Sequence, residues 1–184
     1  MTSDIIEQVL GFWFADGDDQ SRAVWFKTDP FFDQEIERRF KTHHEKARSG
    51  EYDGLAATAR GALALIILLD QFPRNLYRGS PEAFASDPKA LAIARNALAA
   101  NHDRDLSVVQ RTFMYLPFEH SEDWDDQEKS VQLFEDLGDE EKLKYAVEHR
   151  DIVERFGRFP HRNNVLGRPS TPGETEFLKD FDSF

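Results

Sequence analysis

The sequence has 184 residues, a length that fits one domain of ordinary size, and we expect residues 1–184 to form a single domain. Cysteine is absent, which excludes disulfides, a thiolate nucleophile and cysteine-ligated zinc. The formal net charge of −12 disfavours binding to nucleic acids, because their phosphate backbones are also negative.

The sequence also lacks the features of an exported or membrane-bound chain. The first ten residues, MTSDIIEQVL, contain neither a basic segment nor a small-residue cleavage site. The longest apolar run, Ala62 to Leu69, is far shorter than the ~20 residues needed to cross a bilayer. We therefore expect a cytoplasmic protein with neither a membrane nor a nucleic acid among its partners.

Helix signals recur along the chain, whereas strand signals do not. Apolar residues at helical spacing, with capping residues before them and glycine or proline after them, predict about eight helices. The expected helices are Ser3–Trp13, 30–49, 53–72, 88–100, 107–116, 122–137, 140–156 and 172–181. The expected start signals are Ser3, Asp29-Pro30, Asp53, Asp87, Ser121, Asp139 and a capping box at Thr171–Glu174. The expected stops are Gly50, Pro73, Pro117, Gly138 and Gly157.

The loops between these segments are mostly short, which favours antiparallel helical hairpins. The segment from Ala56 to Phe72 is apolar nearly all round, as expected for a helix at the centre of a helical layer. The predicted fold is therefore all-α, with antiparallel hairpins stacked as in tetratricopeptide proteins. No sequence repeat of that period is present, so the repetition would be structural.

The chemically informative residues gather where helices are expected to end, in residues 70–78, 117–122 and 155–163. The first and third segments share a pattern, since Phe-Pro-Arg-Asn at 72–75 returns as Phe-Pro-His-Arg-Asn at 159–163. Proline disfavours regular structure and presents the polar groups beside it on a stiff turn. If the three segments meet at one end of the helical stack, they form a polar pocket.

Two kinds of chemistry suit the side chains of that pocket. Arginine holds phosphate or carboxylate groups through paired hydrogen bonds, and histidine beside carboxylates can transfer protons near neutral pH. The predicted catalytic residues are Glu119, His120 and His161. The predicted ligand-binding residues are Asp70, Arg74, Asn75, Glu122, His149, Arg158, Arg162 and Asn163.

A divalent metal is the less favoured interpretation of the same histidines and carboxylates. Oxygen and nitrogen ligands are present, but no HExxH motif occurs, and the residue four positions after His149 is Val153. We therefore predict no metal site, and the residues leave open whether a cofactor is used and whether the protein is an enzyme.

Four longer motifs resemble a known bacterial family, domain of unknown function 924. They are residues 9–14 (VLGFWF), 68–75 (LLDQFPRN), 115–122 (YLPFEHSE) and the stretch from His149-Arg150-Asp151 to 159–163 (FPHRN). The resemblance covers nearly the whole chain. It implies an all-helical, tetratricopeptide-like fold and no established activity.

Three functional interpretations remain open on the sequence alone. The first is a site for a small phosphate- or carboxylate-bearing ligand, with or without catalysis. The second is a tetratricopeptide-like scaffold for a protein partner. In the third, the Pro-Arg-Asn loops are structural latches in which arginine and asparagine bond free carbonyls at helix ends.

Overall fold

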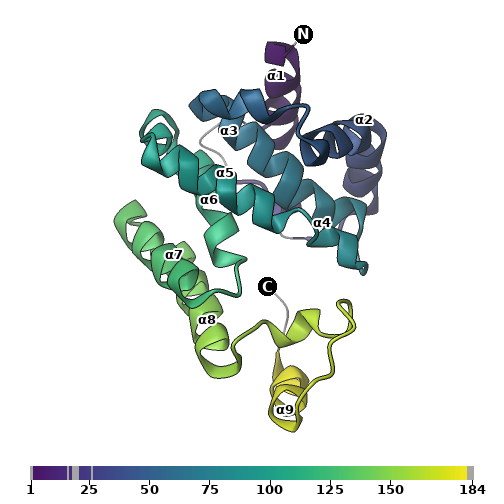
Figure 1. Ribbon diagram of the computed structural model, residues 1–184, viewed down its shortest axis with the longest axis vertical. Helices are drawn as coiled ribbons and strands as arrows, with labels where there is room; N and C mark the ends of the chain where they lie inside the picture. Colours follow the sequence, from purple (N-terminus) through teal and green to yellow (C-terminus); the bar gives the residue numbers. More distant parts are fainter. Residues whose placement is uncertain (1, 16, 18–20, 26, 182–184) are drawn as a thin grey trace. The chain divides into compact units, whose positions relative to one another are not determined.

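The computed structural model describes residues 2–15, 17, 21–25 and 27–181, and these residues form helices and loops but no strand (Figure 1). The all-α prediction is confirmed. The α-helices are α1 (Thr2–Trp13), α2 (Pro30–Ser49), α3 (Ala59–Ile66), α4 (Phe72–Leu76), α5 (Asp87–Ala99), α6 (Val108–Glu119), α7 (Trp124–Leu137), α8 (Glu140–Phe156) and α9 (Pro172–Asp180). A π-helical segment, η3 (Ile67–Gln71), joins α3 to α4, and short 3₁₀ turns are η1 (Ala23–Trp25), η2 (Asp53–Ala57), η4 (Pro81–Ala83), η5 (His102–Asp105) and η6 (Pro160–Arg162).

Most of the helix ends lie where local sequence places them. The Asp29 carboxylate accepts hydrogen bonds from the backbone N–H groups of Phe31 and Phe32, so it caps α2 as predicted. Asp139 caps α8 in the same way, and the predicted capping box of α9 forms between Thr171 and Glu174. Left-handed glycines end three helices, as predicted: α2 at Gly50, α7 at Gly138 and α8 at Gly157.

Several predicted helix starts were wrong. Asp53 begins a 3₁₀ turn rather than the third helix, which is capped instead by Thr58 through a bond to the Gly61 N–H. Gly61 is required there, because a Cβ at this position would lie 1.9 Å from the Leu55 carbonyl oxygen. The η2 turn therefore presses against the first turn of α3.

Three further starts differ by one or two residues. The residue before α5 is Ser86, so that Asp87 is already helical, and α7 is capped by Asp123 rather than Ser121. Ser121 instead donates to the Asp126 carboxylate. Helix α1 includes Ser3, whose side chain lies outside the described residues.

The prediction that Pro73 ends a helix was wrong, because the helix continues through it to Leu76. Proline has no N–H to donate. The N–H of another residue at position 73 would bond the Leu69 carbonyl in an α-helix or the Leu68 carbonyl in a π-helix, so these two carbonyls lack that backbone donor. Side chains replace that donor: the Ser86 hydroxyl donates to the Leu69 carbonyl, and His44 Nδ1 donates to the Leu68 carbonyl at 2.8 Å. The π segment and these two side chains accommodate the proline.

This arrangement predicts that Ser86→Ala destabilises the protein. The substitution leaves the Leu69 carbonyl without the hydroxyl donor in a fully buried setting, a loss worth about 1 to 3 kcal/mol in the free energy of unfolding. The matched control is Ser49→Ala, since the Ser49 hydroxyl also donates to a carbonyl but on an exposed surface. Urea denaturation of both variants tests this, and equal, small losses would contradict the role given to Ser86.

Pro117 was also wrongly predicted to stop a helix, because α6 extends to Glu119 with Pro117 inside it. The start of α6 has a capping box of its own. The Gln110 N–H donates to the Ser107 hydroxyl, and the Gln110 side chain accepts from the Ser107 N–H. Because α6 continues through Pro117, Glu119 lies in the last turn of this helix rather than in a loop.

The chain divides into two compact units. The first comprises Met1–Arg78 and Glu82–Pro117, and α3 lies at its centre, as predicted. Helices α1 and α5 pack against α3, whereas α2 packs against η3 and α4 (Figure 1). Its core includes an aromatic cluster in which Trp13 contacts Trp25, Phe32, Phe72 and Phe113.

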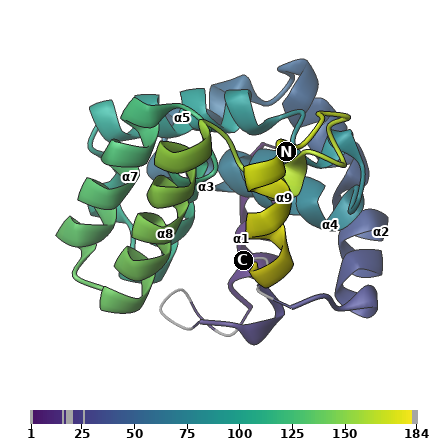
Figure 2. The same ribbon diagram turned by 90° about the horizontal axis from the view of Figure 1, so that it is seen from below.

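The second unit comprises Gly79–Pro81 and Phe118–Phe184. Helices α7 and α8 form an antiparallel hairpin, and they lie side by side in both views (Figures 1 and 2). The turn η6 and the helix α9 follow α8 and pack on each other. A small core of Ile152, Val153 and Phe159 is extended by Phe156, Phe177 and Phe181.

The single-domain prediction and the tetratricopeptide-like stacking of the hairpins stay predictions. Over the described residues, none of the helices combines the length and the apolar character that crossing a membrane requires.

Candidate functional site

The predicted site residues divide between the two units. Those of the first segment, Asp70, Arg74 and Asn75, belong to the first unit. The residues of the other two segments belong to the second unit, namely Glu119, His120, Glu122, His149, Arg158, His161, Arg162 and Asn163. Within the second unit, two of the three predicted segments therefore come together, whereas the meeting of all three stays a prediction.

In the first unit, Arg74 is held by carboxylates and a helix carbonyl. Its guanidinium donates to both carboxylate oxygens of Asp87 at 3.0 Å and to the backbone carbonyl of Asp70. Burial opposes the charged form, but the carboxylates of Asp70 and Asp87 raise the pKa of Arg74 above its usual value. Asn75 donates to the Asp33 carboxylate at 2.7 Å. These contacts fit a latch of the kind that the sequence suggested.

In the second unit, the last turn of α6 meets the middle of α8. Glu119 and His149 are both buried, and a carboxylate oxygen of Glu119 lies 3.6 Å from His149 Nδ1. The same Nδ1 lies 2.8 Å from the Tyr145 carbonyl, which can only accept, so Nδ1 carries the proton. The neutral His149 ring then uses Nε2 as its acceptor.

His149 is kept uncharged by its surroundings. Burial lowers its pKa to about 3, against the effect of the Tyr145 carbonyl and together with the nearby Arg162 guanidinium and the rings of His120 and His161. Its short separation from Glu119 is therefore a contact between a neutral ring and a carboxyl group at neutral pH, not an ion pair.

The turn η6 supplies His161 and Arg162 to the same place. Burial and the charge of Arg162 lower the pKa of His161 to about 4, although Glu122 acts in the opposite direction. The Arg162 guanidinium is buried, lies 4.5 Å from the centre of the Phe159 ring and donates to the His120 carbonyl at 2.9 Å. We name Glu119, His120, His149, His161 and Arg162 the His–Arg cluster.

Two other predicted residues, Glu122 and Asn163, hold the chain that carries this cluster. Glu122 accepts from the Phe159 N–H at 2.8 Å and from Arg168 at 2.6 and 2.9 Å. Burial opposes the effect, but Arg168 and the Phe159 N–H lower the pKa of Glu122. Asn163 accepts from Arg168 at 3.0 Å. These bonds of Glu122 and Asn163 are all to groups of the protein itself.

Arg158 has an equally close internal partner, Glu174. The two side chains are joined by bonds of 2.6 and 2.9 Å, and Glu174 also accepts from the Thr171 N–H. The bonds from Arg158 and Thr171 lower the pKa of Glu174 strongly. Arg158 therefore fastens the start of α9 to the end of α8.

Sequence reasoning missed Gln127, which fixes the segment bearing Glu119 and His120. Its side-chain amide donates to the carbonyls of Glu119 at 2.8 Å and Ser121 at 2.6 Å, with a longer bond to that of Phe118 at 3.4 Å. Arg162 bonds the intervening His120 carbonyl. Gln127 lies in a polar stretch of α7, and no local pattern distinguishes it from its neighbours.

The described residues contain no group of three or more histidine, aspartate or glutamate side chains arranged to hold a metal ion. The chemistry that the His–Arg cluster offers is instead that of a buried guanidinium beside neutral imidazoles and a carboxyl group. Such a set can attract an anion and exchange a proton with it.

Comparison with known proteins places the chain in a family. No curated protein matches it. A solved structure, the protein of unknown function ATU0120 from Agrobacterium tumefaciens, is 42% identical, with a TM-score of 0.92 over 98% of this chain and 100% of that one. Residues 9–182 match the model of a family described as bacterial protein of unknown function, DUF924. The chain therefore belongs to the DUF924 family.

Proposed function

We propose that the protein binds a small anion, carrying a phosphate or carboxylate group, at the His–Arg cluster of the second unit. The observation that carries this proposal is the buried guanidinium of Arg162, which bonds the His120 carbonyl and follows His161 in the turn η6. The rings of His149 and His161 have lowered pKa values and stay uncharged near neutral pH, so Arg162 supplies the positive charge of the cluster. A buried cation within a chain of net charge −12 favours an anionic ligand.

The roles of the cluster residues follow from their bonds. Arg162 attracts the anion, and its bond to the His120 carbonyl keeps that histidine beside the same ligand. Glu119, His120 and His161 are the proposed proton-transfer groups, and His149 is oriented toward them by the Tyr145 carbonyl. The cytoplasm, with its phosphorylated and carboxylated metabolites, is the proposed location.

The test is a titration with inorganic phosphate, followed through the imidazole NMR signals of the six histidines. We expect the signals of His120, His149 and His161 to move together, and those of His43, His44 and His102 in the first unit to stay in place. The variant Arg162→Lys keeps a charge but loses the fork of donors, so phosphate affinity falls about tenfold, or about 1.4 kcal/mol.

The matched control is Arg150→Gln. Arg150 lies on α8 beside His149, but its guanidinium is bonded to Asp151. The control variant retains wild-type affinity if the cluster is the site. Failure of phosphate to move any histidine signal, or an equal loss in both arginine variants, would refute the proposal.

The alternative function is a scaffold for a protein partner, and one observation favours it. Among the residues that the structure describes, four large apolar side chains lie exposed, Phe31 most of all at 81%. In that case the Pro-Arg-Asn loops are structural latches, as the bonds of Arg74 and Arg162 to backbone carbonyls also suggest. The phosphate titration then gives no effect, while Phe31→Ser removes binding of the partner.

A further inference from the structure

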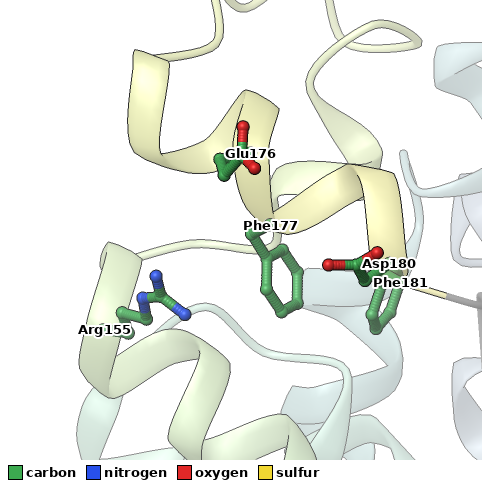
Figure 3. A pocket seen from close by; sticks show the side chains of 5 residues that line it. All are labelled: Arg155, Glu176, Phe177, Asp180 and Phe181. Atoms are coloured by element: carbon green, nitrogen blue, oxygen red, sulfur yellow. The ribbon is translucent and has the colours of Figure 1, made fainter.

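A hollow of about 280 Å³ lies in the second unit between the end of α8 and the helix α9 (Figure 3). Arg155 comes from the last turn of α8, and the other lining residues come from α9 and the residue after it, namely Glu176, Phe177, Asp180 and Phe181. None of these five residues belongs to the His–Arg cluster or was singled out as a site residue.

The hollow carries opposite charges on its two sides. Figure 3 shows the Phe177 ring between Arg155, on α8, and Asp180, on α9. The Arg155 guanidinium lies over the rings of Phe156, at 4.7 Å, and Phe177, at 5.9 Å. Within the described part of the chain, neither Arg155 nor Asp180 forms an ion pair, whereas Glu176 pairs with Lys179. Arg155 and Asp180 are therefore available to a ligand that carries both signs.

The floor of the hollow is aromatic. The Phe177 and Phe181 rings lie 5.0 Å apart, and Phe181 is also stacked on His161, with centroids 5.5 Å apart and planes 17° from parallel. A ligand resting on these rings contacts the residue that packs directly on His161. The histidine signal of the His–Arg cluster therefore reports on the hollow as well.

We propose that this hollow binds a free α-amino acid with an aromatic side chain. The ligand carboxylate pairs with Arg155, its ammonium group pairs with Asp180, and its ring lies on Phe177 and Phe181. A simple anion is disfavoured by the two carboxylates of the hollow, and a simple cation by Arg155. The volume lies just below the ~300 to 1,000 Å³ of pockets for drug-sized ligands, which restricts the occupant to a small molecule.

The experiment is an NMR titration of the full chain with L-phenylalanine, compared with 3-phenylpropionate and phenethylamine. These two probes keep the ring and one charge each. We expect L-phenylalanine to move the amide signals of residues 155, 177, 180 and 181 and the ring signal of His161. Each one-charge probe binds more weakly by up to about fivefold, since it loses one of two exposed ion pairs.

Two variants test the charges separately. Arg155→Gln and Asp180→Asn are exposed substitutions that leave the fold intact, and each weakens L-phenylalanine binding by up to about fivefold. Arg150→Gln, on the same helix, leaves it unchanged. Equal affinity for the three probes, wild-type affinity in both variants, or no movement of these signals would overturn the proposal. L-Phenylalanine also carries a carboxylate, so the amide signals of residues 155, 177, 180 and 181, none of which belongs to the His–Arg cluster, distinguish binding in the hollow from binding at the anion site proposed above.

Discussion

Replacing Arg74 with alanine should lower the free energy of unfolding by about 3 kcal/mol, the largest loss expected from any single arginine of the first unit. Arg74 is three-quarters buried and bonds both oxygens of Asp87, while Asp70 beside it is fully buried. Without the guanidinium, the carboxylates of Asp70 and Asp87 lose the cation that both of them contact. A chain of this length should lose about 6 to 12 °C in melting temperature.

Arg78→Ala is the matched control for Arg74→Ala. Arg78 lies in the same segment and also pairs with a carboxylate, that of Asp33, but it is exposed, so its loss costs less than about 1 kcal/mol. Thermal and urea denaturation separate the two variants. The latch role also requires that Arg74→Ala leave phosphate affinity unchanged. A stable variant that no longer binds phosphate would show Arg74 to be a ligand residue instead.

The contrast between Arg74 and the helix caps shows which parts of the fold sequence patterns can predict. Asp29, Asp139 and Thr171 cap helices through bonds to N–H groups two or three residues away, so the pattern contains both partners. The prediction that Pro73 ends a helix was wrong for the opposite reason, because the partners that matter are distant in the sequence. The carbonyls near Pro73 are bonded by His44, 24 residues before Leu68, and by Ser86, 17 residues after Leu69. No local window includes those donors.

The candidate site follows the same division. Density of charge singles out residues 119–122 and 149–163, and the second unit brings these two segments together. Charge density does not distinguish a charged residue that bonds other groups of its own chain from one that faces a ligand. Glu122 and Arg158 were predicted to bind a ligand, yet their bonds are to Phe159, Arg168 and Glu174. Those partners lie 16 to 46 residues away.

Acid should destabilise the protein well above the pH at which carboxylates are protonated. The pKa of His149 falls from 6.5 to about 3 on folding, and that of His161 from 6.5 to about 4. Because folding lowers both pKa values, the unfolded chain binds more protons than the folded chain below pH 6.5. Stability is then full above pH 6.5 and falls as the pH drops toward 4 and 3. His44, whose pKa burial also lowers, acts in the same direction.

The loss should reach about 3 kcal/mol for each of the two histidines by pH 4, at about 1.4 kcal/mol for each unit of pKa difference. Glu122, whose pKa is also lowered, begins to contribute only below about 4.5, so the interval from pH 6.5 to 4.5 isolates the histidines. Urea denaturation across that interval measures the slope. His149→Gln and His161→Gln should each flatten it, because a neutral amide cannot be protonated there. Variant curves that stay parallel to the wild type would show that neither ring is buried uncharged.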